Sequence, residues 1–190
     1  MLLPKECSLR THSRMKYSPL LTVLLISACA GDSTAPKQNA ILGLGNPAFI
    51  GFTADAYTAA QKSGSFWAVA GQSRSLSLRY ADTGEEFLRF TVGSHSLTGD
   101  SVRIDVSVAD DGSMRFHFEP SGLHFNPNDP AELRVDLGRA RVGPLTSLFA
   151  SIWRQDLPGL PWLKLPTIHL SGDNVESDVQ HFTDFGMAVN

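Results

Sequence analysis

The chain has 190 residues, 42% of them hydrophobic, with 16 Lys and Arg residues against 19 Asp and Glu residues. This length is enough for one domain with a hydrophobic core of its own. The formal net charge of −3 disfavours binding to nucleic acid and to anionic lipid headgroups, because both attract basic surfaces. We therefore expect no nucleic-acid partner.

The first 28 residues have the organisation of a secretory signal peptide. A segment with four Lys and Arg residues precedes a short apolar run, 20–28, which is too short to span a bilayer. The run closes on two small residues before Cys29, and this end, 26–29, resembles the lipobox of bacterial lipoproteins. The resemblance implies that residues 1–28 are removed and that Cys29 is acylated and becomes the mature N-terminus.

Charge and cleavage together indicate how the protein would be held at a membrane. The leader carries four of the 16 basic and one of the 19 acidic residues, which leaves 12 basic against 18 acidic residues and a formal charge of −6. Acyl chains on Cys29 are therefore the expected anchor, at about 0.8 kcal/mol per buried methylene. In the lipoproteins that the leader resembles, an Asp after the cysteine signals inner-membrane retention. Ala30 stands there, which favours the outer membrane or cell surface.

Cysteine use restricts the chemistry of the mature fold. The chain has two Cys residues, of which Cys7 lies in the leader and Cys29 is the expected lipidation site. We therefore expect a domain without disulfides, thiolate metal sites or thiol nucleophiles, and no motif indicates a cofactor. The polar, Pro-containing segment 29–40 is expected to be the lipidated tether, and 41–190 a single domain.

Downstream of the tether, the pattern changes from one short helix to many strands. Thr53 is a candidate N-cap for an alanine-rich helix over 54–62. Apolar and polar residues then alternate, most clearly over 102–108 and 114–118, which with the Asp-Asp-Gly turn between them predict a β-hairpin over 101–119. Further strands are predicted over 76–80, 88–92, 131–137, 148–153, 163–170, 175–181 and 185–189. Seven to nine short strands predict an all-β fold, an antiparallel β-sandwich.

Several segments resemble ZU5-like β-sandwich domains. The strand before the Pro-Ser-Gly corner at 120–122, the Phe and Pro-containing bend up to residue 127, and the alternating strand 131–137 follow the order of features in that family. The closing segment 181–189 resembles the last strand of the family. The resemblance covers about 74–190. It implies an interaction or scaffold module, and hence a non-catalytic binding role in the bacterial cell envelope.

The tripeptide His181-Phe182-Thr183 is the strongest candidate for chemistry. Self-cleaving ZU5-type and GAIN domains are cut at a similar His-x-Ser/Thr tripeptide. By that resemblance, Thr183 would attack the Phe182 carbonyl with His181 as the base, and 183–190 would be separated from the chain. The same tripeptide also closes domains that are not cut, and no feature of the sequence indicates the strain that cleavage uses. A structural role is favoured, and self-cleavage stays an alternative.

Other polar groupings do not reach the number of ligands that a metal site needs. His117 and Glu119 share one strand face, and His124 lies beyond the corner, whereas structural metal sites use three or more converging ligands. The acidic turns at 110–111 and 173–178 contain oxygen ligands for calcium, but their composition is that of ordinary turns. The sequence has no G-x-S-x-G, H-E-x-x-H or P-loop motif. We expect neither a metal site nor an enzyme.

The remaining candidate for binding is the apolar segment 153–162. Trp153 and Trp162 flank leucines and prolines, a composition that predicts a recognition surface for an envelope protein or a glycan. The favoured alternative is that the segment folds back over the open end of the sandwich. Trp67 is expected in the core. A different class of function, a small-ligand carrier, would require the strands to close into a barrel.

Overall fold

The computed structural model describes residues 43–143, 147–170 and 172–189. The expected signal peptide (1–28), the expected lipidation site Cys29 and the expected tether (29–40) lie outside this part of the chain. Strands dominate the described residues, and α1 (Ala54–Ala59) is a short helix among them. The fold is therefore all-β, as predicted.

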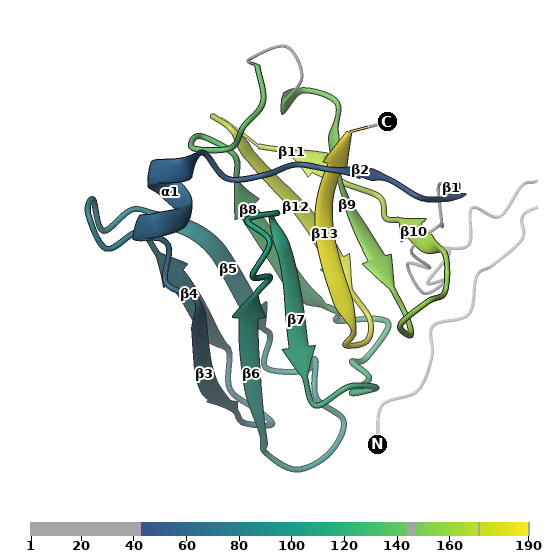
Figure 1. Ribbon diagram of the computed structural model, residues 1–190. Helices are drawn as coiled ribbons and strands as arrows, with labels where there is room; N and C mark the ends of the chain where they lie inside the picture. Colours follow the sequence, from purple (N-terminus) through teal and green to yellow (C-terminus); the bar gives the residue numbers. More distant parts are fainter. Residues whose placement is uncertain (1–42, 144–146, 171, 190) are drawn as a thin grey trace, which may run out of the picture. The chain divides into compact units, whose positions relative to one another are not determined.

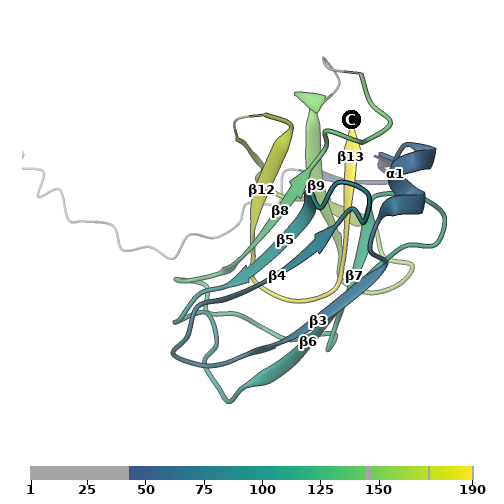
Figure 2. The ribbon, with the colours of Figure 1, turned by 90° about the vertical axis from the view of Figure 1, so that its left-hand side faces the viewer.

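The strands form two sheets in which every pairing is antiparallel. The larger sheet contains, in spatial order, β1 (Gly43–Gly45), β10 (Trp162–Lys164), β9 (Ala150–Gln155), β13 (Asp184–Val189), β7 (Arg115–Glu119), β6 (Val102–Val108) and β3 (Ser63–Ala68), with β2 (Ala48–Phe49) paired to β13. The smaller sheet contains β11 (Ile168–His169), β12 (Asn174–Val179), β8 (Ala131–Asp136), β5 (Glu86–Val92) and β4 (Arg74–Arg79). The two sheets lie as two layers (Figure 1, Figure 2).

This arrangement confirms the predicted β-sandwich. Nine of the described strands have five or more residues, in agreement with the seven to nine predicted, and four more have two or three residues. Strands that short contain too few residues to display a period of two. Each sheet ends in edge strands and does not close on itself. The strands therefore do not form the closed barrel that the small-ligand carrier alternative requires.

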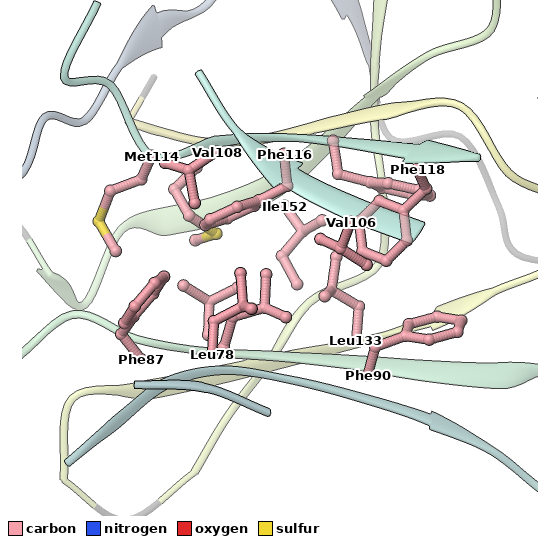
Figure 3. Close-up of a cluster of buried hydrophobic side chains, with 14 of the residues drawn as sticks. Leu78, Phe87, Phe90, Val106, Val108, Met114, Phe116, Phe118, Leu133 and Ile152 are labelled. Atoms are coloured by element: carbon pink, nitrogen blue, oxygen red, sulfur yellow. The ribbon is translucent and has the colours of Figure 1, made fainter. Parts of the chain in front are cut away.

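The core lies between the sheets and is formed by the apolar half of each alternating strand. In β6, Ile104, Val106 and Val108 are buried while the intervening residues face outward. Figure 3 shows side chains from both sheets meeting in this layer, among them Leu78, Phe87, Phe90, Leu133, Phe116, Phe118 and Ile152. Burying one such side chain contributes roughly 1.5–3 kcal/mol. Burial of these side chains is the main favourable contribution to folding.

The hairpin and the helix confirm the local signals that predicted them. Strands β6 and β7 pair with Val106 opposite Phe118, and Gly112 in their turn has φ 76°, a conformation that favours glycine. The Thr53 hydroxyl caps α1 by accepting from the Ala56 N–H at 3.3 Å. The helix ends at Ala59 instead of residue 62 because the next residues pair with the end of β4.

Strand β3 lies where no strand was predicted, and it determines the position of Trp67. Phe66 and Ala68 point inward, so Trp67 points outward and its side chain is 56% exposed. The expectation that Trp67 lies in the core is therefore wrong. Gly64 on the inner face leaves space for β4 of the other sheet, since a Cβ there would lie 2.9 Å from Leu78 Cδ2.

Candidate functional site

The two tryptophans of the apolar segment do not form an exposed recognition surface. Trp153 and Trp162 are only 5% and 8% exposed. Together with Ala188 they form a small apolar cluster separate from the main core, against which Phe49 packs with its ring 4.6 Å from that of Trp162. Both indoles cover part of the outer face of the larger sheet and expose only a small part of their surface, so their role as a binding surface stays a prediction.

The loop between these tryptophans is the exposed part of the segment. Leu157 is 62% exposed, and the backbone of Leu160 accepts a hydrogen bond from the Gln155 side chain at 2.6 Å. The loop is thus held against the end of β9. The apolar composition of the segment is thus divided: the flanking tryptophans are buried, whereas the leucines of the loop are exposed.

The tripeptide at 181–183 is built into the end of the sandwich. The Thr183 hydroxyl donates its single proton to the Gln155 carbonyl of β9, and it is therefore not directed at the His181 imidazole. The Phe182 carbonyl, which cleavage would attack, accepts from the Gly122 N–H at 3.2 Å. This geometry serves strand pairing and does not assemble a nucleophile with its base.

His181 itself is a partly buried histidine, with its side chain 21% exposed. Burial is the main cause that lowers its pKa below the ordinary value, and the nearby Arg154 charge adds to the effect. Its Nε2 lies 3.6 Å from Asp156 Oδ1, and its ring centre lies 5.4 Å from that of His124. His124 is therefore at this end of the sandwich, and not with His117 and Glu119, where a metal site would need it.

His117 has the opposite environment, on the outer face of β7. When its ring is protonated, Nδ1 donates to Asp184 Oδ1 at 2.6 Å and Nε2 donates to Glu119 Oε1 at 2.9 Å. These hydrogen bonds, that to Asp184 first, raise the pKa of His117 above its ordinary value. Glu119 also accepts from the Ser121 N–H at 2.6 Å, which is the main cause that lowers the pKa of Glu119.

Strand order brings the partners of His117 together. Asp184 lies directly opposite His117 because β13 pairs with β7, although 67 residues separate them in sequence. Glu119 lies two residues along the same strand face. Within the described ranges, no group of three or more His, Cys, Asp or Glu side chains is placed to hold a metal ion. The trio is a hydrogen-bonded cluster in which the imidazole joins two carboxylates.

Two adjoining hollows open on either side of this histidine. The first has a volume of about 370 Å³, and its lining includes Arg115, Gln155 and Trp162. The second has a volume of about 260 Å³, and its lining includes Ser65 and Arg103. Both are also lined by His117 and Ser107. We call the two hollows together the outer-face groove; most of its lining residues belong to strands of the larger sheet.

Most charged side chains of the groove are held by ionic contacts with one another or with a neighbouring turn. Arg103 Nη2 lies 3.0 Å from Asp105 Oδ1 and donates to Ser65 Oγ at 3.3 Å. Arg115 pairs with Asp111 from the turn between β6 and β7. Each pair keeps donors and acceptors available, because a guanidinium has five N–H groups and a carboxylate about four lone-pair sites. The groove is a polar surface whose side chains are already oriented.

No family model, no curated protein and no solved structure matches this chain. The ZU5-like resemblance stays a prediction, carried by the residues that suggested it. In the part of the chain that the structure describes, no helix is both long and apolar enough to cross a membrane.

Part of this site was accessible to sequence reasoning and part was not. His117 and Glu119 stand out as polar residues on one strand face. Arg103 and Asp105 lie at the outward positions of the most regular alternating strand, so their face is readable, but nothing in the sequence marks them as functional. Asp184 could not be assigned to the site without knowing that β13 lies beside β7.

Proposed function

We propose that the protein is a lipoprotein of the bacterial cell envelope whose β-sandwich is a non-catalytic binding module. In this proposal, acyl chains on Cys29 hold it in the membrane, at the outer membrane or cell surface. The ligand binds in the outer-face groove. The sequence supports the anchor through the order of basic, apolar and small residues before the cysteine.

One observation carries the binding role: the groove side chains are fixed by mutual contacts before any ligand arrives. His117 is held at both ring nitrogens, and Arg103 is held by Asp105 and Ser65. Ordering polar side chains is a cost of binding, and a surface that is already ordered avoids most of it.

The contacts of Phe182 and Thr183 at the end of the sandwich fit a non-catalytic role better than self-cleavage. The Thr183 hydroxyl is engaged by the Gln155 carbonyl, and the Phe182 ring is buried in the core. Cleavage needs the hydroxyl to lie against the preceding carbonyl with a base within hydrogen-bond reach. The contacts of Thr183 support a structural role.

The binding role is tested by retention of envelope components on the full-length protein. The bait is compared with an Arg103→Ala/His117→Ala variant, in which the groove loses two fixed side chains. Arg89→Ala is the matched control, because Arg89 pairs with Glu86 at 2.9 Å on the smaller sheet. We expect components retained by the wild type and the control to be lost from the double variant. Equal retention by all three proteins would exclude the groove.

The anchor is tested separately with a Cys29→Ser variant in the bacterial envelope. The wild type is expected to partition into detergent and to carry the mass of acyl chains at residue 29, whereas the variant is expected to stay in the aqueous phase. Detergent partition of the variant equal to that of the wild type would contradict lipidation at Cys29.

A further inference from the structure

We infer that the ligand of the outer-face groove is an uncharged oligosaccharide whose chain lies across the strands of the larger sheet. The inference rests on the proposed binding function and specifies the chemistry of the ligand. Four properties of the groove carry it: its charge balance, its hydrogen-bonding capacity, its aromatic surfaces and its direction.

Most charged side chains of the groove are paired within the protein, and the lining as a whole has more carboxylates than cationic groups. Arg103 pairs with Asp105, and Arg115 with Asp111. His117, when protonated, lies between Asp184 and Glu119. A site for a polyanion would leave cationic side chains unpaired, as sites for phosphate and carboxylate groups do.

A site for a cation would need the reverse arrangement, with free carboxylates converging on one point. Asp105 is bound to Arg103, and both Asp184 and Glu119 are bound to His117. The excess of carboxylates disfavours an anion, and among the described residues these carboxylates do not converge as a cation site requires, so the lining favours a ligand without net charge.

Hydrogen-bonding capacity remains after this pairing. The side chains of Arg103 and Glu119 are 58% and 49% exposed, and Ser107 and Gln155 add a hydroxyl and an amide to the lining. The groove therefore offers both donors and acceptors at close spacing. Sugar hydroxyls both donate and accept, so they can use each of these groups.

Aromatic side chains lie toward the two ends of this surface. Trp162, although mostly buried, lines the first hollow. Trp67 is exposed on the same face of β3 as Ser65, which lines the second hollow, and lies opposite Arg103 of β6. The C–H faces of sugar rings are apolar and pack against the negative face of an indole, while the hydroxyls at the ring edge reach polar neighbours.

The direction of the groove favours a chain of sugar units over a single one. Trp67 belongs to β3 and Trp162 to β10, which are separated by β6, β7, β13 and β9 in the larger sheet. Neighbouring strands lie about 4.8 Å apart, so this path spans roughly 24 Å. A single sugar ring would occupy one hollow and leave the other side chains without a partner.

A peptide is less well matched to the same surface. Extended peptides commonly bind by adding to a sheet edge, where backbone groups are free. The strands at the centre of the groove, β6, β7 and β13, are each paired on both sides. Recognition in the groove therefore has to use side chains, which suits hydroxyl groups.

The test is calorimetric titration of the full-length protein, purified in detergent, with defined hexasaccharides. The neutral probes are those of glucose, N-acetylglucosamine, mannose and xylose, and hexagalacturonate is the charged comparator. We expect at least one neutral hexasaccharide to bind. Trp67→Ala and Glu119→Gln should each weaken that binding about ten-fold or more.

Phe149→Ala is the matched control, because Phe149 is also an exposed aromatic residue, at 69%, and does not line the groove. Its affinity should stay within about two-fold of the wild type. Circular dichroism of each variant checks that the sandwich is intact. Binding of hexagalacturonate alone, or neutral binding that Trp67→Ala and Glu119→Gln leave unchanged, would overturn the inference.

The remaining outcomes separate this inference from the function on which it rests. If no hexasaccharide binds but an envelope protein is retained in a groove-dependent way, the glycan inference fails and the binding function stands. If no hexasaccharide binds and no component is retained through the groove, both fail.

Discussion

His117 and His181 lie beside carboxylates in two different regions of the same sandwich. His117, on the outer face of the larger sheet, has a hydrogen bond at each ring nitrogen, and its pKa is raised. His181, at the end of the sandwich, lies 3.6 Å from Asp156 and near Arg154, and burial lowers its pKa. The same side chain is half-exposed with a raised pKa in one region and partly buried with a lowered pKa in the other.

The contrast separates a surface that can bind from an end that closes the fold. Side chains around His117 are paired with one another and still accessible to a ligand. Those around His181 are used by the protein, because the Thr183 hydroxyl and the Phe182 backbone bond to neighbouring segments. A histidine next to an acidic residue is therefore no guide to function until its burial and its hydrogen bonds are known.

The largest expected effect on stability comes from a substitution at Phe182, at the end of the sandwich where His181 lies. The Phe182 side chain is buried, and its ring lies 5.0–5.2 Å from those of Phe90, Phe118 and Phe125. Phe182→Ala should lower the free energy of unfolding by about 3–5 kcal/mol because it leaves a cavity in the core. Urea denaturation measures this, with Trp67→Ala as an exposed aromatic control expected to change it by less than about 0.5 kcal/mol. A similar small loss for both would contradict a structural role for Phe182.

A smaller effect on stability is expected at Gly186, which lies under the Phe49 ring beside the cluster of the two tryptophans. A Cβ at Gly186 would lie 2.5 Å from Phe49 Cε1, so Gly186→Ala should displace the Phe49 ring at a cost of about 1–3 kcal/mol. In a Phe49→Ala background the same change should cost much less, since the clash is gone. Thermal or urea denaturation of the four proteins measures the coupling. Equal costs in both backgrounds would show that Phe49 does not cover Gly186.

The two histidines should respond to pH in opposite directions. The raised pKa of His117 stabilises the fold below 6.5, the unfolded value, and this contribution is lost as the pH rises through the folded pKa. The lowered pKa of His181 means that its contribution is present above 6.5 and lost as the pH falls through its folded pKa. NMR titration of the ring protons should place the His117 midpoint above that of His181. The reverse order would contradict the comparison.

No change at all is expected from the candidate self-cleavage residues. Intact mass under denaturing conditions should show an uncut C-terminus in the wild type and in Thr183→Val, because the hydroxyl is bonded to Gln155. Loss of 183–190 from the wild type, prevented in Thr183→Val, would restore the self-cleaving alternative.

The fold was largely predictable because its signals are local. The alternation over 102–108 and the Asp-Asp-Gly turn define a hairpin without any knowledge of the rest of the chain, and Thr53 defines the start of α1. The site was less predictable because it depends on a distant pairing that puts Asp184 beside His117. The position of Trp67 is not predictable for a related reason: the face that it occupies depends on β3, a strand without a clear alternating pattern in the sequence.

The central claim, that the outer-face groove is occupied in the cell envelope, is tested most directly by carboxyl labelling of the protein in intact envelopes and after purification. Asp105 and Glu119, whose side chains are about half exposed, should be protected in the envelope relative to the purified protein. Exposed Glu85, beside the smaller sheet, should be labelled equally in both. Equal labelling of Asp105 and Glu119 in the two preparations would contradict the claim.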